Sequence, residues 1–162
     1  MKTTLIDAGC ITMVQKAIEY ELDASQTYLA LANQMQGLGY FGAQRFFLSE
    51  SNDERAHYQR HVDFLNDLGV VAAVPALKAQ AVKAATFRDA FALAMGRETD
   101  LLEFYRDMTK KLFPEYPEVF AHFMEFVGIQ VKAVGEYGDL LARIDAVADD
   151  KCGLLIIDKE IG

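Results

Sequence analysis

The chain has 162 residues, 52% of them hydrophobic, and carries a net charge of −8 at pH 7. This length suits a single domain over residues 1–162 with a substantial core, and no apolar run approaches the ~18 residues that cross a bilayer. The negative charge disfavours nucleic acids and anionic membranes as partners and favours cations. The first ten residues show no secretory signal, so we expect a cytoplasmic protein, although a transit peptide already removed would leave no trace.

Two long helices are predicted in the first part of the chain. Their apolar residues recur at steps of three and four, and glycines follow each pattern, at positions 37, 39 and 42 and again at position 69. These signals predict helices over residues 11–36 and 43–68, joined by a short turn.

A long connection separates this pair from a second pair of helices. It contains Pro75 and has no clear amphipathic period, and Thr86 is a suitable N-cap for a third helix that runs to Leu112. Prolines at positions 114 and 117 then break the chain before a fourth helix over residues 118–146. We therefore predict an all-α four-helix bundle with one long crossover connection and a short C-terminal helix.

Polar residues interrupt the apolar stripe near the middle of every long helix. They are Glu21 in the first, Glu54 and His57 in the second, Glu98 in the third and Gln130 in the fourth. In such a bundle these side chains meet at one height in the interior, where three carboxylates without a cation would repel one another. A pair of divalent ions would neutralise them, and the Glu-x-x-His spacing allows Glu54 to bridge two ions while His57 completes one of them. The pattern predicts a buried dinuclear metal centre.

Three further polar residues share these stripes. Glu50 and His61 lie about one turn from the cluster, and we expect each to be a hydrogen-bonded or partly solvated group rather than a metal ligand. His61 is about 6 Å along the helix axis from His57, which we expect to be too far to share an ion with Glu21. Tyr28 follows Glu21 by seven residues on the same face, where a phenol next to a redox metal could donate a hydrogen bond or an electron.

Several segments resemble ferritin. "ELDASQTYLALA" is similar to the first-helix motif of that family, "NDERAHYQRH" to its second-helix Glu-x-x-His, and "QVKAVGEYGDLL" to the fourth-helix segment that begins with Gln. The last residues, "GLLIIDKEIG", resemble the end of prokaryotic non-haem ferritins. The resemblance covers almost the whole chain.

The resemblance implies a ferroxidase centre that binds two irons per subunit and oxidises Fe(II) with O2 or H2O2. Glu21, Glu54 and His57 would hold the first iron, and Glu54, Glu98 and Gln130 would lie near the second. Members of the family assemble into a hollow cage of twenty-four subunits that stores ferric mineral. In that cage, His122 and Glu125 would line a channel for Fe(II).

Bacterioferritin is a close alternative, but the haem-ligating Met that follows the second-helix Glu in that family is replaced by Arg55. Its second Glu-x-x-His is absent as well, because Ala133 follows Gln130 by three residues. A carboxylate for a third iron, which some prokaryotic ferritins have near Ala133, is also missing, so we expect no haem and no third site of that kind. Two other hypotheses stay open, a cage subunit without oxidase activity and a rubrerythrin-like di-iron enzyme acting on an organic substrate or peroxide.

Overall fold

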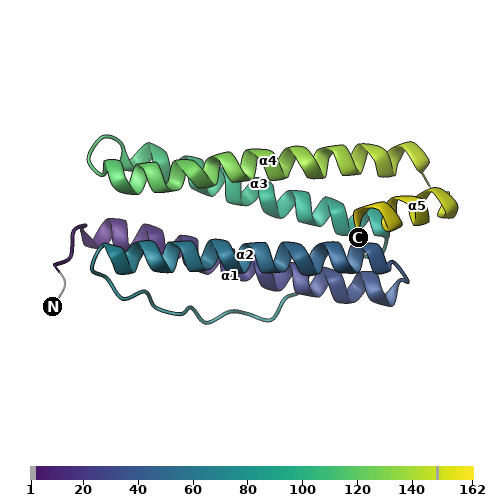
Figure 1. Ribbon diagram of the computed structural model, residues 1–162, viewed down its shortest axis with the longest axis horizontal. Helices are drawn as coiled ribbons and strands as arrows, with labels where there is room; N and C mark the ends of the chain where they lie inside the picture. Colours follow the sequence, from purple (N-terminus) through teal and green to yellow (C-terminus); the bar gives the residue numbers. More distant parts are fainter. Residues whose placement is uncertain (1–2, 149) are drawn as a thin grey trace.

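The computed structural model describes residues 3–148 and 150–162, and their regular structure is entirely helical. The five helices are α1 (Ala8–Gly37), α2 (Phe41–Asp67), α3 (Phe87–Leu112), α4 (Pro117–Val147) and α5 (Lys151–Ile161). Figure 1 shows α1 antiparallel to α2 and α3 antiparallel to α4. An extended segment connects α2 to α3 and runs the length of the bundle along the outer side of α1 and α2. The predicted four-helix bundle with one crossover and a short C-terminal helix is confirmed, and the predicted ends of the long helices differ from those observed by a few residues at most.

The helix ends follow from local residues. The side chain of Asp7 accepts a hydrogen bond of 2.8 Å from the Cys10 N–H and caps α1. The predicted cap at Thr86 is confirmed, because its hydroxyl accepts from the Asp89 N–H while the Asp89 carboxylate accepts from the Thr86 N–H. Gly39 and Gly69 follow α1 and α2 with φ of 87° and 82°, a conformation that glycine adopts without steric cost.

Side-chain amides of α1 hold the crossover connection in place. Gln15 donates to the carbonyl of Ala73 (2.6 Å) and accepts from its N–H (3.0 Å). Further along, Gln34 donates to the carbonyl of Val82 (3.0 Å) and accepts from the N–H of Ala84 (2.6 Å). These pairs satisfy backbone groups of a segment that has no regular secondary structure of its own.

The core lies between the two helix pairs. On α1 the predicted stripe is buried throughout, from Val14 to Met35. On α4 the buried residues are Val119, Phe123, Phe126, Gln130, Tyr137 and Ile144, while Val127 is only half-buried. These buried residues follow one another at steps of three, four or seven, which is the spacing of a single helical face.

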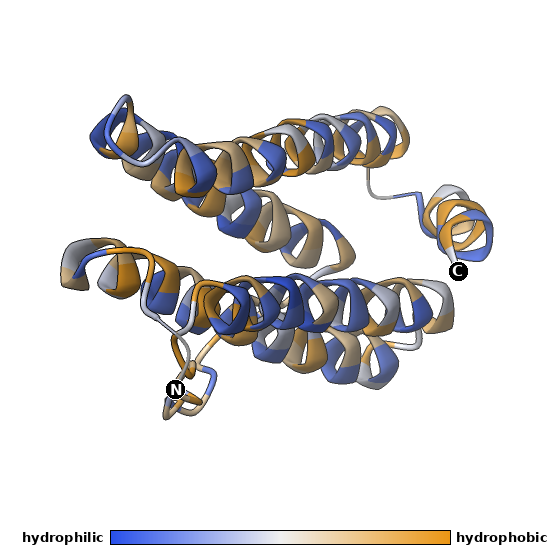
Figure 2. Cartoon of the chain, turned by 60° about the vertical axis from the view of Figure 1, so that its left-hand side comes forward, coloured by the Kyte–Doolittle hydropathy of each residue, from blue (hydrophilic) through white to orange (hydrophobic). Residues whose placement is uncertain are grey.

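The short helix α5 lies across the end of the bundle (Figure 2). Its Asp158 carboxylate accepts hydrogen bonds from the Gly42 N–H (3.0 Å) and the Ala43 N–H (2.7 Å) at the start of α2. The α2 N-cap residue, Tyr40, makes no side-chain capping bond, so Asp158 performs that role from a distant part of the chain. A Cβ at position 42 would lie 1.6 Å from the Asp158 carbonyl oxygen, so this contact requires glycine.

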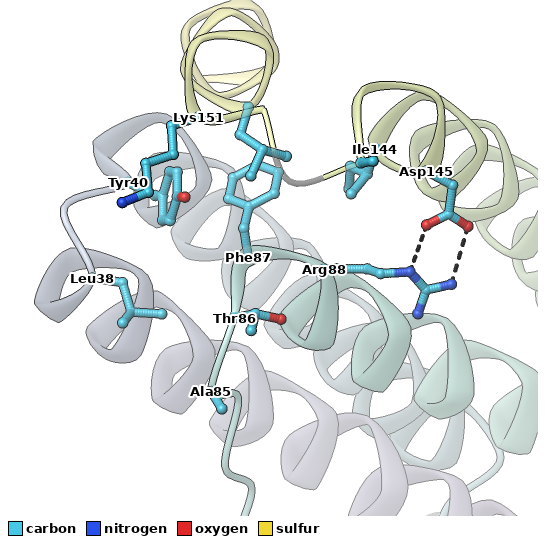
Figure 3. Close-up of a pocket in the computed structure, with 11 residues that line it drawn as sticks. Leu38, Tyr40, Ala85, Thr86, Phe87, Arg88, Ile144, Asp145 and Lys151 are labelled. Atoms are coloured by element: carbon cyan, nitrogen blue, oxygen red, sulfur yellow. Dashed lines mark hydrogen bonds and ion pairs between the residues drawn. The ribbon is translucent and has the colours of Figure 1, made fainter.

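A cavity of about 660 Å³ lies near the junction of α5 with the bundle. Figure 3 shows Tyr40, Phe87 and Ile144 at its wall and the Arg88 guanidinium paired with both oxygens of Asp145, at 2.5 and 3.0 Å. None of the interior carboxylates lines it. Across the described part of the chain, no helix combines the length and apolarity needed to traverse a membrane.

Candidate metal centre

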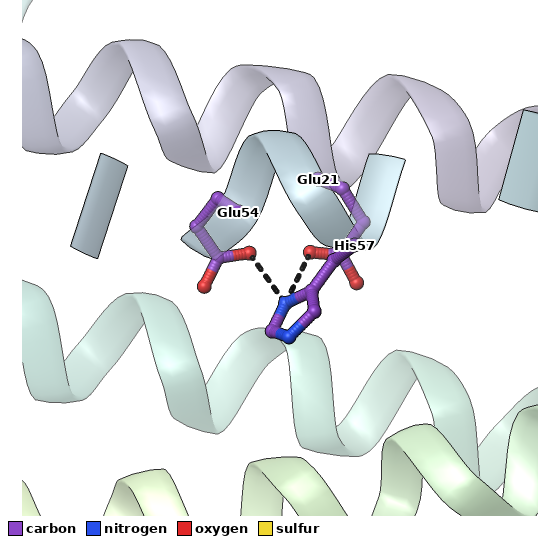
Figure 4. A group of neighbouring side chains, drawn as sticks. All are labelled: Glu21, Glu54 and His57. Atoms are coloured by element: carbon purple, nitrogen blue, oxygen red, sulfur yellow. Dashed lines mark hydrogen bonds and ion pairs between the residues drawn. The ribbon is translucent and has the colours of Figure 1, made fainter. Parts of the chain in front are cut away.

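Glu21, Glu54 and His57 come together in the middle of the bundle, as the sequence predicts. One ligand atom from each lies within 4.8 Å of the others. The His57 Nδ1 atom is 3.4 Å from Glu54 Oε2 and 3.6 Å from Glu21 Oε2, and Figure 4 shows the imidazole between the two carboxylates. Because α1 supplies one carboxylate and α2 supplies the other together with the imidazole, packing of the two helices assembles the group. Oxygen and nitrogen ligands at this spacing suit a divalent first-row metal.

The electrostatics show that these carboxylates cannot all carry their charge unaided. Burial, with the charges of Glu21 and Glu98 added, raises the pKa of Glu54 well above its ordinary value. Burial would also raise the pKa of Glu21, but interactions with the neighbouring Glu54, His57 and His61 side chains outweigh it and lower that pKa. One carboxylate is therefore ionised at the expense of the other, and a cation between them would remove the conflict.

Glu98 of α3 completes the acidic cluster. Its side chain is 1% exposed and accepts a hydrogen bond from the Tyr28 hydroxyl. Burial raises the pKa of Glu98 to about 7, against the lowering effect of the Tyr28 bond. A cavity of about 290 Å³ is lined by Glu54, His57 and Glu98 and also by the exposed Asp53 and Glu136, so it leads from the surface to the buried carboxylates.

Two buried groups in this region have no hydrogen-bond partner among the described residues. They are Glu21 Oε2 and the amide of Gln130, both of whose polar atoms are unpaired. Gln130 is fully buried on α4, and its neighbours Ile129 and Ala133 line the cavity. Buried polar atoms normally have a hydrogen-bond partner. The unpaired oxygens of Glu21 and Gln130 are therefore the atoms that would be available to a bound ion.

The remaining polar residues of the second stripe behave differently from one another. Glu50 is half-buried and accepts a hydrogen bond of 2.8 Å from the Tyr137 hydroxyl, in agreement with the expectation of a hydrogen-bonded group. The expectation that His61 lies away from Glu21 is wrong, because its Nε2 atom is 3.8 Å from Glu21 Oε1 and the ring is fully buried. The expectation used only the axial rise of about 6 Å from His57. It left out the length of the His61 side chain, which reaches along the helix axis toward α1.

Tyr105 is the site residue that the sequence analysis missed. Its hydroxyl donates to Glu21 Oε1 and lies 2.8 Å from His61 Nε2. A signal for it exists, since Tyr105 follows Glu98 by seven residues just as Tyr28 follows Glu21. Because α1 and α3 run in opposite directions (Figure 1), each tyrosine reaches the glutamate of the other helix.

The two residues predicted to line a channel are also in contact with α2. His122 is half-buried, with its Nε2 atom 2.9 Å from His61 Nδ1 and its ring stacked on Phe64 at 3.9 Å. Burial, with the neighbouring His61 and Arg60, lowers the pKa of His122 to about 3. Glu125 is exposed and pairs with Arg60 at 2.6 Å. His122 is thus turned toward its own bundle, and a channel between subunits stays a prediction.

Comparisons with known proteins agree with this geometry. The sequence profile of the Ferritin family, described as a ferritin-like domain, matches residues 11–147. A bacterial non-heme ferritin of Staphylococcus aureus is 20% identical over 159 residues, which cover 98% of this chain and 96% of that protein. A probable bacterial non-heme ferritin-like protein of Haemophilus influenzae is 20% identical with the same coverage.

Solved structures show the same fold. An open pore ferritin from the archaeon Archaeoglobus fulgidus superposes with a TM-score of 0.92 at 18% identity, covering 96% of this chain and 97% of that one. A humanized archaeal ferritin also gives a TM-score of 0.92 at 18% identity, over 96% and 95% of the two chains. The molecule is a four-helix bundle with one long crossover connection and a cluster of Glu and His side chains inside it. The chain belongs to the ferritin family.

Proposed function

We propose that the chain is the subunit of an iron-storage ferritin that oxidises Fe(II) to Fe(III) at its own di-iron centre. Membership of the family supports iron storage at a general level. The observation that supports the oxidase centre is the convergence of Glu21, Glu54 and His57 ligand atoms within 4.8 Å of one another, with one carboxylate oxygen left unpaired. In this proposal two Fe(II) ions are the substrate, O2 or H2O2 is the oxidant, and no haem takes part.

Each residue has a defined task in this proposal. Glu21 and His57 bind the first iron, Glu54 bridges the two, and Glu98 binds the second with Gln130 beside it. Carboxylate oxygens suit the reaction because hard anionic ligands favour Fe(III) over Fe(II), while the imidazole retains affinity for Fe(II). Glu54, whose pKa burial raises, gives up its proton as iron binds, so affinity for iron should increase with pH. Tyr28 orients Glu98 through its hydroxyl.

Stopped-flow oxidation of Fe(II) tests the proposal. Wild-type protein should oxidise two Fe(II) per subunit rapidly, Glu54→Ala should abolish the rapid phase, and His57→Ala should retain slow activity because one site keeps its carboxylates. Glu103→Ala removes the same charge from an exposed position on α3 and should leave the rate unchanged. Binding without oxidation would identify a non-oxidising cage subunit. Oxidation that depends on an added organic substrate would identify another di-iron enzyme.

A further inference from the structure

Three residues outside the proposed ligand set form a continuous hydrogen-bonded chain that ends on Glu21. The His122 and His61 rings are joined at 2.9 Å, the His61 ring and the Tyr105 hydroxyl at 2.8 Å, and Tyr105 donates to Glu21 Oε1. His61 and Tyr105 are fully buried. The proposed function assigns no task to any of the three. Burying imidazole and phenol groups costs free energy unless they are hydrogen-bonded, and in this chain each of them is.

The positions of the hydrogens in this chain follow from counting donors. Tyr105 has one hydroxyl proton, and it goes to Glu21, so the phenol oxygen can only accept from His61. His61 therefore carries its proton on Nε2, which leaves Nδ1 as an acceptor for the Nε2–H of His122. Every bond in the chain then has one donor and one acceptor, and the His61 imidazole is neutral.

The consequence for Glu21 is that its two oxygens differ. Oε1 is occupied by the Tyr105 hydroxyl, whereas Oε2 has no hydrogen-bond partner among the described residues and lies 3.6 Å from His57 Nδ1, on the side of the proposed ligands. A carboxylate held in this way offers one oxygen rather than two. We infer that Tyr105, itself held by His61 and His122, positions Glu21 as a one-oxygen ligand of the first metal ion.

This inference rests on the proposed function only in so far as Glu21 must bind a divalent ion. His61 and His122 are positioning residues in it and touch no metal, since both nitrogens of His61 are engaged in the chain. Groups that orient a ligand in this way typically change metal affinity by about 10- to 100-fold when removed. The effect should appear without any oxidation.

Anaerobic titration with Co(II), followed by its visible absorption, measures both affinity and coordination. Wild-type protein should bind Co(II) in a manner abolished by Glu54→Ala. Tyr105→Phe should weaken binding by about 10-fold or more and alter the spectrum, because Glu21 is then free to offer both oxygens. His61→Leu should do the same to a smaller extent, and His61→Gln, which can still donate to Tyr105 and accept from His122, should restore most of the affinity.

Two further variants separate positioning from packing. The double variant His61→Leu with Tyr105→Phe should bind no more weakly than Tyr105→Phe alone, because His61 acts only through the phenol. Phe123→Leu is the matched control, since the Phe123 ring packs against His61 at 5.9 Å and Tyr105 at 5.6 Å without a hydrogen bond. It should lower stability and leave the Co(II) spectrum unchanged.

Three results would overturn the inference. Unchanged affinity and spectrum in both His61→Leu and Tyr105→Phe would refute the positioning role and leave the proposed function standing. Loss of one bound ion in His61→Leu, instead of weaker binding, would make His61 a ligand. Absence of any Glu54-dependent Co(II) binding in the wild-type protein would refute the proposed function itself, and the inference with it.

Discussion

The buried carboxyl group of Glu98 favours its protonated form in the folded protein. Burial raises its pKa from 4.5 to about 7, and the charge of Glu21 adds to the rise. A raised pKa means that the folded state favours the protonated form, so the associated stability is complete below pH 4.5 and is lost as pH rises through about 7. Without metal, the centre should therefore weaken the protein as neutral pH is approached.

We predict that Glu98→Gln removes this dependence in metal-free protein. The free energy of unfolding, measured with denaturant between pH 4.5 and 7.5, should gain on that of the wild type as pH rises, because the amide has no proton to lose. Taking the difference between the two proteins cancels the opposite contribution of His122, whose lowered pKa makes stability rise over part of this range. Glu103→Gln, at an exposed position, should give a flat difference. A flat difference for Glu98→Gln as well would contradict the raised pKa.

At the scale of single residues, the sequence indicated the proposed ligands but not the side chains that contact them. Glu21, Glu54 and His57 could be found because a polar residue in an apolar stripe is visible from helical periodicity alone. The contact of His61 with Glu21 could not, since it depends on how a side chain of α2 reaches α1. Periodicity gives the face of a helix and says nothing of which atom on a neighbouring helix that face will meet.

At the scale of the helices, Asp158 of α5 makes a polar contact with the start of α2. The two N–H groups at the start of α2 are satisfied by Asp158, which also places a negative charge at the positive end of the α2 dipole. Loss of a helix cap costs about 0.5–2 kcal/mol, and the same substitution also removes this polar contact between α5 and α2.

We predict that Asp158→Ala destabilises the folded chain by about 1–2 kcal/mol in denaturant unfolding. Amide exchange at Gly42 and Ala43 should accelerate, since these are the two donors that lose their acceptor. Asp158→Asn keeps one carbonyl acceptor and should lose less. Unchanged exchange at the start of α2 in Asp158→Ala would show that the cap is replaced by another group.

The helices themselves were predictable from the sequence, but the polar contacts that connect them to other segments were not. Glycine, proline and a capping threonine gave all four long helices to within a few residues, because these signals act within one or two turns. The cap of α2 lies 116 positions further along the chain. The amides of Gln15 and Gln34 that hold the crossover likewise look like ordinary surface residues until the connection folds against them.

At the scale of the whole molecule, several large apolar side chains are exposed on the surface of the subunit. On α5, Leu155 is 54% exposed and Ile156 is 60% exposed, and on the crossover Val71 is 90% exposed. Exposed apolar residues gathered on one element are typical of surfaces that other subunits cover. We therefore predict a large symmetric assembly, the twenty-four-subunit cage that the resemblance implies.

Sedimentation of the native protein tests this prediction. Ile156→Glu should shift the distribution toward small species, because a buried charge at a subunit contact is costly. Lys159→Glu changes the charge of the same helix at another exposed position and should assemble like the wild type if apolar contact is what matters. A native protein found only as monomers or dimers would refute the cage.

The bond between Asp158 and the start of α2 also sets an order of events during synthesis. Residues 41–67 leave the ribosome long before position 158 is made, so the first N–H groups of α2 lack their Asp158 acceptor while the crossover, α3 and α4 are synthesised. Domains fold as their chains emerge, but here a residue of α5 completes the cap of α2, which is made much earlier. A nascent chain stalled before residue 158 would therefore fray at the beginning of α2, and this fraying would stop once Asp158 reaches Gly42 and Ala43.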